Sequence, residues 1–314
     1  MIKKEGNIMY KILLGTYTRD KSEGIYQVDL ANNKLSNLSL YIKTDNPTYL
    51  AWGTNHQELI AVASEGELAG VKIFQEKDLK VKILSKQTAP CFVSYQNGNY
   101  YSAYYHEGKV EKYFNDELVA EMNYQKTAKS HFILPDENKL WVVNLGEDKI
   151  YWILEDEIIT YQTKENSGPR HLVLGENDLV YVLTELSNEV LVLKKEAKQL
   201  TLRQTIQLEG EPTNQSAAIR LSSDKRYLYT STRGDDFLTV FQVGEDGLLT
   251  KIQTISSYGK HPRDFALSPD DKFLVCANRD SNSLTLFEVD KSNGRLRLLE
   301  KDVYAPEVVA VLFY

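Results

Sequence analysis

The sequence predicts an all-β fold, a single seven-bladed β-propeller with four antiparallel strands in each blade. Three observations indicate it: a turn followed by an apolar run recurs seven times, further strand patterns follow each recurrence, and the two chain ends carry complementary parts of one blade. Composition agrees, because the 314 residues include 20 Tyr but only 3 Trp and 3 Met, and Tyr favours strands. We expect one domain over residues 1–314, with residues 1–9 as a flexible N-terminal extension.

The first strand of each blade is expected where a turn leads into a short apolar run. These openings lie roughly 40 to 47 residues apart, which is the period of propeller blades. The seven segments are Asn46–Trp52, Ala89–Tyr95, Ser130–Leu134, Gly168–Leu174, Ser216–Leu221, His261–Leu267 and Pro306–Leu312.

Three more strands are expected after each opening. A second strand follows a turn, as in Lys139–Asn144 and Leu179–Thr184, and a third alternates apolar and polar residues, as in Leu238–Val243. A fourth strand is more polar, as in Leu200–Ile206. Four antiparallel strands complete one blade.

The chain ends supply two fragments of the remaining blade. Pro306–Tyr314 reads as a first strand with nothing after it, whereas Tyr10–Tyr17, Gly24–Val28 and Lys34–Ile42 read as second, third and fourth strands without a first. Pairing the fragments closes the ring and leaves no open sheet edge around it. The alternatives, a sandwich or two smaller β domains, do not predict this complementarity.

Composition also limits the partners and the location. The net charge of −7 and the lack of a Lys or Arg run argue against nucleic acid. Lys11 interrupts the only apolar stretch near the N-terminus, which is too short for a signal sequence or a membrane span. We expect a cytoplasmic protein with no membrane partner, as a monomer or a weak dimer.

Motifs for cofactors and metals are missing from the sequence. There is no Walker loop, no Gly-x-Gly-x-x-Gly after a strand, no Gly-x-Ser-x-Gly and no His-Glu-x-x-His. Cys91 and Cys276 lie far apart without metal-ligand spacing, so we expect two free, buried thiols. No cofactor and no metal site are predicted.

The candidate site follows from propeller geometry, in which first strands line the central channel and second strands run antiparallel beside them. The start of a first strand and the end of a second strand therefore share one rim. Ionisable side chains gather at these positions: His131, Arg170, His171, His261 and Arg263 at the openings, and Glu185, Arg233 and Arg279 at or after the ends of second strands. Such a cluster suits a small anionic substrate, and Glu185 or His131 could act as base toward water while guanidinium groups stabilise an oxyanion.

Structural roles compete with binding at several of these residues. His171 and Asp264 could join turns of neighbouring blades, Arg279 could pair with Asp280 at the rim, and Arg220 is expected to pair rather than bind. His56 and His106 are expected at the surface. The blade formed by both termini shows no ionisable candidate, so we expect the chemistry between His131 and Arg279.

At these residues the sequence resembles the lactonase family of seven-bladed propellers, which includes bacterial 6-phosphogluconolactonases and the fungal carboxymuconate-lactonizing enzyme. The matching segments span nearly the whole chain: Leu13–Thr18, Gly24–Tyr26, Asn144–Ile150, Gly168–Leu172, Tyr181–Leu186, Thr232–Asp236, His261–Asp270 and Asn278–Asn282. The resemblance implies His131, Arg170, Glu185 and Arg233 as the catalytic set and adds Arg263 from another shared motif. From their positions at the rim, His171, His261, Arg263 and Arg279 are the candidates for substrate binding.

The resemblance further implies a hydrolase that opens 6-phosphogluconolactone to 6-phosphogluconate in the pentose phosphate pathway. Because arginines outnumber carboxylates among the candidate residues, we expect it to be metal-independent. The chain departs from the family at Ala128–His131, where Pro-His-x-His is usual, and at Thr232, where Asn is usual. A different sugar-acid lactone is therefore an open alternative. A lyase acting on a muconate-type lactone and a non-enzymatic scaffold that binds a protein or peptide are the others.

Overall fold

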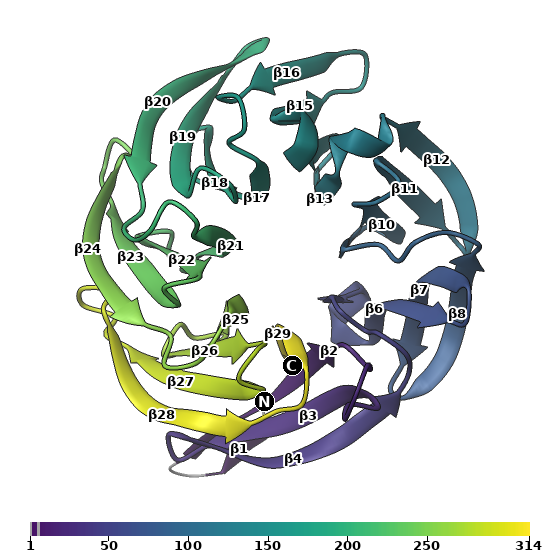
Figure 1. Cartoon of the computed structure of the whole chain (residues 1–314), viewed down its shortest axis with the longest axis vertical. Coiled ribbons are helices and arrows are strands. Elements are labelled where there is room, and N and C mark those ends of the chain that lie inside the picture. Colours follow the sequence, from purple (N-terminus) through teal and green to yellow (C-terminus); the bar gives the residue numbers. More distant parts are fainter. Residues whose placement is uncertain (1, 5–6) are drawn as a thin grey trace.

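The computed structural model describes residues 2–4 and 7–314, and in them 29 strands form seven antiparallel sheets around a central channel (Figure 1). The predicted seven-bladed propeller is confirmed, with one sheet for each blade. Within the described residues, the helical segments are three short 3₁₀ turns, η1 (Thr54–His56), η2 (Lys126–Ala128) and η3 (Leu145–Glu147). No helix in these ranges is long and apolar enough to cross a membrane.

Each blade is given from its inner to its outer strand. Blade 1 joins both termini and contains β29 (Val308–Phe313), β2 (Asn7–Thr16), β3 (Gly24–Ala31) and β4 (Lys34–Lys43), with the short β1 (Ile2–Lys4) beside the start of β2. Blade 2 contains β5 (Leu50–Trp52), β6 (Glu58–Glu65), β7 (Leu68–Gln75) and β8 (Asp78–Ser85). Blade 3 contains β9 (Phe92–Gln96), β10 (Asn99–Tyr104), β11 (Lys109–Phe114) and β12 (Glu117–Asn123). Blade 4 contains β13 (Ser130–Asp136), β14 (Lys139–Asn144), β15 (Lys149–Ile153) and β16 (Ile158–Gln162). Blade 5 contains β17 (Pro169–Leu174), β18 (Leu179–Thr184), β19 (Glu189–Glu196) and β20 (Gln199–Gln207). Blade 6 contains β21 (Gln215–Leu221), β22 (Tyr227–Arg233), β23 (Phe237–Val243) and β24 (Leu249–Ser256). Blade 7 contains β25 (Pro262–Leu267), β26 (Phe273–Asn278), β27 (Ser283–Val289) and β28 (Leu296–Tyr304).

Blade 1 closes the ring as the sequence predicts. Strand β29 pairs antiparallel with β2, with Ile12 opposite Phe313 and Leu14 opposite Val311. The first and last strands of the chain are thereby held in one sheet, and the first strand of this blade comes from the C-terminus.

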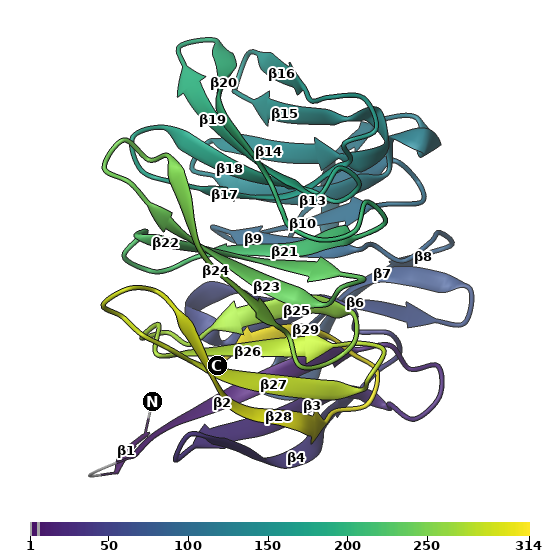
Figure 2. The ribbon, with the colours of Figure 1, turned by 60° about the vertical axis from the view of Figure 1, so that its left-hand side comes forward.

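The N-terminal residues before Tyr10 differ from a plain extension. Ile2–Lys4 pairs with the first residues of β2, and Figure 2 shows this hairpin projecting from the ring. Residues 1, 5 and 6 of the predicted flexible extension lie outside the described residues. Its flexibility stays a prediction.

The hydrophobic core lies between neighbouring blades, where their faces meet. In one cluster Tyr229 of blade 6 packs with Phe265 and Phe287 of blade 7, and in another Trp141 and Trp152 stack with ring centroids 5.5 Å apart. Middle strands are buried on both faces, so their sequences are nearly continuous apolar runs, whereas the outer strands alternate with exposed polar residues. The core therefore forms a ring of wedges, and the channel in the middle is left for polar side chains.

Candidate functional site

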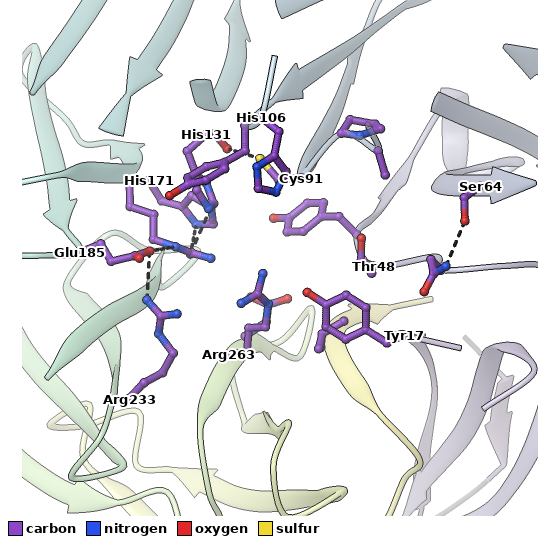
Figure 3. A pocket seen from close by; sticks show the side chains of 18 of the residues that line it. Tyr17, Thr48, Ser64, Cys91, His106, His131, His171, Glu185, Arg233 and Arg263 are labelled. Carbon is purple, nitrogen blue, oxygen red and sulfur yellow. Dashed lines mark hydrogen bonds and ion pairs between the residues drawn. The ribbon is translucent and has the colours of Figure 1, made fainter. Parts of the chain in front are cut away.

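A cavity of about 430 Å³ occupies one mouth of the central channel (Figure 3). Six of the eight predicted site residues line it: His131, Arg170, His171, Glu185, Arg233 and Arg263. They come from the starts of the inner strands of blades 4, 5 and 7 and from the ends of the second strands of blades 5 and 6. The shared rim that the sequence predicts is therefore the rim that holds the cavity.

A β-bulge at the start of the inner strand directs three of these side chains. His131, Arg170 and Arg263 are each the extra residue between two successive pairs of the ladder, for example between Pro169 opposite Thr184 and His171 opposite Leu183. Bulges re-aim a side chain out of the regular alternation of a strand. In blade 1 the same position is Val309, which also lines the cavity and supplies an apolar wall.

Glu185 is shared by two guanidinium groups at the centre of the site. Arg170 Nε lies 2.8 Å and Arg233 Nη2 3.0 Å from Glu185 Oε2. Both arginines are buried, with 4% and 6% of their surfaces exposed. Burial alone would raise the pKa of Glu185, but the charges of Arg170 and Arg233 outweigh it and the pKa is lowered. The carboxylate is therefore ionised in the folded protein.

Backbone carbonyls of blade 6 hold both arginines in place. Arg233 donates to the carbonyls of Gln215 and Ser216 at 3.1 and 2.9 Å, and Arg170 Nη1 donates to the carbonyl of Ala217. Because these carbonyls belong to the inner strand β21, the guanidinium groups are fixed relative to the channel. The geometry is thus set before any ligand arrives.

Two neutral imidazoles complete the buried wall. The rings of His131 and His171 lie 5.1 Å apart, and His171 also packs against Phe92 and Phe132. Burial, followed by the charge of Arg170, holds the pKa of both histidines well below the usual range. His131 Nδ1 is buried without a hydrogen-bond partner in the described part of the chain, so it is available to a ligand.

His261 and Arg279 are placed differently from the prediction. Neither belongs to the residues that line the cavity in the described chain. Arg279 Nε lies 2.6 Å and His261 Nδ1 3.4 Å from the Asp280 carboxylate, which gives the rim ion pair that the sequence offered as the alternative. Burial and the charge of Arg279 lower the pKa of His261 to about 4. Substrate binding by these two residues stays a prediction. Their absence from the cavity lining gives it no support.

Two ionisable residues of blade 1 line the cavity, although the sequence pointed to no ionisable candidate in this blade, and the expectation that the chemistry lies between His131 and Arg279 stays a prediction. Tyr17 and Arg19, which follow β2, line the cavity, and His106, expected simply at the surface, is exposed at the same cavity. Tyr17 directly follows the second strand of its blade, as Glu185 does in blade 5. The search along the sequence covered ionisable residues at the starts of first strands and the ends of second strands. Had it included aromatic residues and the turn after each second strand, it would have found Tyr17 and Arg19.

Both cysteines are free thiols, as predicted, but only Cys276 is fully buried, because Cys91 is partly exposed at the cavity. Cys91 lines the cavity, and its Sγ lies 3.5 Å from the carbonyl oxygen of His131. Burial raises the pKa of the Cys91 thiol to about 12. The thiol is therefore protonated at neutral pH and acts as part of the wall.

No group of three or more His, Cys, Asp or Glu side chains that could hold a metal ion occurs within residues 2–4 and 7–314. That the protein works without a metal or a cofactor stays a prediction from the sequence.

Known proteins match the chain over nearly its whole length. The 6-phosphogluconolactonase of Bacillus subtilis is 33% identical, and the match covers 96% of this chain and 97% of that protein. The crystal structure of a protein from Lactobacillus plantarum superposes with a TM-score of 0.91 at 32% identity, covering 98% of this chain and all of the other. The periplasmic gluconolactonase of Pseudomonas aeruginosa, with a TM-score of 0.85 at 24% identity and coverage of 98% and 99%, shows the same fold.

Family membership rests on residues 11–313, which match the lactonase family described as a 7-bladed beta-propeller. That range takes in all seven blades and every residue that lines the cavity. The chain therefore belongs to the lactonase family of seven-bladed β-propellers.

Proposed function

We propose that this protein hydrolyses an anionic sugar lactone, 6-phosphogluconolactone, to 6-phosphogluconate by attack of water in the cavity at the channel mouth. The observation that carries the proposal is the buried Glu185, ionised and held between Arg170 and Arg233 beside two neutral imidazoles. The Bacillus subtilis relative bears the name of this activity. The proposal places the protein in the pentose phosphate pathway and, as the sequence suggests, in the cytoplasm.

Glu185 is the base in this proposal. Both arginines make their shortest contacts with Oε2, and Oε1 accepts no hydrogen bond from the described residues, so its lone pairs can accept a proton from water. The lowered pKa makes the Glu185 carboxylate a weak base, but the carboxylate carries a negative charge that attracts the proton. His131, by contrast, is a neutral imidazole whose pKa is lowered much further. A lactone is an activated ester, so modest base assistance suffices.

The arginines stabilise the charge that develops on the carbonyl oxygen. Arg170 Nη2 and Arg233 Nη1 have no hydrogen-bond partner among the described residues, although the other nitrogens of both groups are engaged. Water adds to the lactone carbonyl, its proton passes to Glu185, and the tetrahedral oxyanion receives these N–H donors. Cleavage of the ring C–O bond then returns the proton from Glu185 to the leaving ring oxygen, which becomes the sugar hydroxyl. The carboxylic acid so formed releases its remaining proton to solvent and leaves as the carboxylate.

A coupled assay with 6-phosphogluconate dehydrogenase tests the activity against spontaneous hydrolysis. Wild-type protein should accelerate product formation, and Glu185→Gln should lower the acceleration by about 100-fold or more, the usual contribution of a general base. Glu185→Asp keeps the charge and guards against loss of the fold, and it should retain part of the activity. The control Glu165→Gln changes an exposed carboxylate and should match wild type.

Three results would contradict the proposal. Folded wild-type protein that gives no acceleration would favour the scaffold alternative, and loss of the diene absorbance of a muconate substrate instead would favour the lyase. Glu185→Gln with wild-type turnover would remove the assigned base.

A further inference from the structure

The cations that line the cavity are of two kinds. Arg170 and Arg233 share the Glu185 carboxylate, whereas Arg263 and Arg19 have no acidic side chain within ion-pair distance anywhere in the described chain. The neighbouring Asp264 does not compensate Arg263, because Asp264 Oδ1 is engaged by Arg220 Nη2 at 2.7 Å. At one end of the cavity the Glu185 carboxylate neutralises part of the positive charge of Arg170 and Arg233. Elsewhere the cavity carries two guanidinium groups without a counter-charge among the described residues, although the protein has a net charge of −7.

The Arg19 loop is held by a carboxylate from the other end of the chain. Glu307, in the turn before β29, accepts hydrogen bonds at 3.0 Å each from the backbone N–H groups of Arg19, Asp20, Lys21 and Ser22. Four successive N–H groups on one carboxylate form an anion-binding nest. Burial opposes ionisation, but these N–H donors outweigh it and lower the pKa of Glu307, so the nest is filled by a charge that the protein itself supplies.

Tyr17 connects this loop to the cavity. The Arg19 guanidinium stacks over the Tyr17 ring at 4.1 Å from its centroid, and both residues line the cavity. Figure 3 shows Arg263 lying between the Glu185 and Arg233 pair on one side and Tyr17 on the other. An extended ligand can therefore reach from Glu185, past Arg263, toward the Arg19 loop.

We propose that Arg19 together with Arg263 binds the phosphate group of the substrate, and that Glu307 is the residue that positions Arg19. The inference rests on the proposed lactone hydrolysis and names the part of the site that selects a phosphorylated lactone. A phosphate dianion is matched by two unpaired guanidinium groups, each able to offer paired N–H donors. With the phosphate there, the lactone ring lies toward Arg170 and Glu185.

The proposed phosphate site links closure of the ring to substrate specificity, because Glu307 beside the C-terminal strand holds the N-terminal loop that carries Arg19. Arg19 follows the first long strand of the chain, and Glu307 directly precedes the last. The phosphate end of the site is therefore complete only when β29 has joined blade 1. The cluster of Glu185, Arg170 and Arg233, by contrast, is built wholly from blades 5 and 6.

Calorimetric binding of the product separates the inference from catalysis. Wild-type protein should bind 6-phosphogluconate more tightly than gluconate, and Arg19→Met should weaken only the phosphorylated ligand, by about 10- to 100-fold, the range for one charged hydrogen-bonding group. Lys21→Met is the matched control, because it removes a positive charge from the same loop at an exposed residue that does not line the cavity. It should bind both ligands as wild type does.

Glu307→Gln tests the positioning role through the ratio of the KM values for the phosphorylated and the unphosphorylated lactone, which a general loss of stability does not change. The variant should raise the KM for 6-phosphogluconolactone and leave the KM for unphosphorylated glucono-δ-lactone near the wild-type value, at a temperature well below its melting point. Equal changes for both lactones would show that Glu307 is merely structural.

The outcomes for the two proposals differ. Arg19→Met with wild-type affinity for 6-phosphogluconate, or with equal losses for both ligands, overturns this inference even if lactone hydrolysis is observed. Binding of 6-phosphogluconate that depends on Arg19 without accelerated lactone opening upholds the phosphate site and overturns the proposed hydrolysis. Wild-type protein that binds neither ligand overturns the phosphate site.

Discussion

Arg220 Nη2 lies 2.7 Å from Asp264 Oδ1 at the place where the cavity of the site meets a second cavity, of about 560 Å³, in the central channel. Asp264 lines both cavities, Arg220 lines the second, and Asp264 Oδ2 accepts a hydrogen bond at 3.1 Å from the N–H of Val311. The pair therefore joins the inner strands of the neighbouring blades 6, 7 and 1 along the wall of the channel. Burial raises the pKa of Asp264, and the Arg220 guanidinium limits the rise.

Removing Arg220 should destabilise the fold. Arg220→Met leaves the buried Asp264 carboxylate without its counter-charge, and we expect the free energy of unfolding at pH 7.5 to fall by about 3–5 kcal/mol. Urea denaturation measures it. The double variant with Asp264→Asn should recover much of the loss, and a single variant as stable as wild type would show that the pair carries no stability.

Glu185 is expected to stabilise the protein as well as to act in the site. Glu185→Gln leaves Arg170 and Arg233 buried without a counter-charge, which should lower the free energy of unfolding by about 3–5 kcal/mol. Inorganic phosphate should restore part of the melting temperature by binding the uncompensated cations at the cavity, since a ligand of the native state alone stabilises it. A melting temperature that neither falls in the variant nor responds to phosphate would contradict this account.

The buried histidines predict that acid weakens the fold. His131 and His171 have pKa values well below the ordinary value near 6.5, so below about pH 6.5 the unfolded chain binds protons that the folded chain does not. Stability from this source is complete above that pH and is lost as the pH falls, by about 1.4 kcal/mol per pH unit for each histidine. Urea midpoints between pH 8 and pH 5 measure the slope. His171→Phe, which keeps a ring against Phe92 and Phe132, should reduce it, and an unchanged slope would rule out His171 as a source.

The thiols should be unreactive in the native protein. Burial raises the pKa of Cys91 to about 12 and that of Cys276 still further, so almost no thiolate exists at pH 8. With a thiol-specific disulfide reagent we expect no rapid reaction in buffer and two equivalents in guanidinium chloride. Fast labelling of one thiol in native protein would show that Cys91 is reached through the cavity as a thiolate.

Particular residues show how far the sequence led to the site. His131, Arg170 and Arg263 were found because they open inner strands, and Glu185 and Arg233 because they end second strands, which the antiparallel order brings to one rim. Arg279 met the same rule but turns to Asp280, since a charge at the rim can pair locally. Arg19 was not singled out because it lies in the loop beyond the end of β2, and that loop is held by Glu307, 288 residues away in the chain.

The sequence by itself determined the blade count, the strand order and the closure of the ring, because each depends on apolar periodicity and on turns that repeat along the chain. Only the tertiary structure decided which charges neutralise one another. Ion pairing depends on distances of a few ångströms between side chains from different strands and blades, and no local pattern encodes these. That is why Arg170 and Arg233 share Glu185 whereas Arg19 and Arg263, similar in sequence terms, remain uncompensated at the cavity in the described chain.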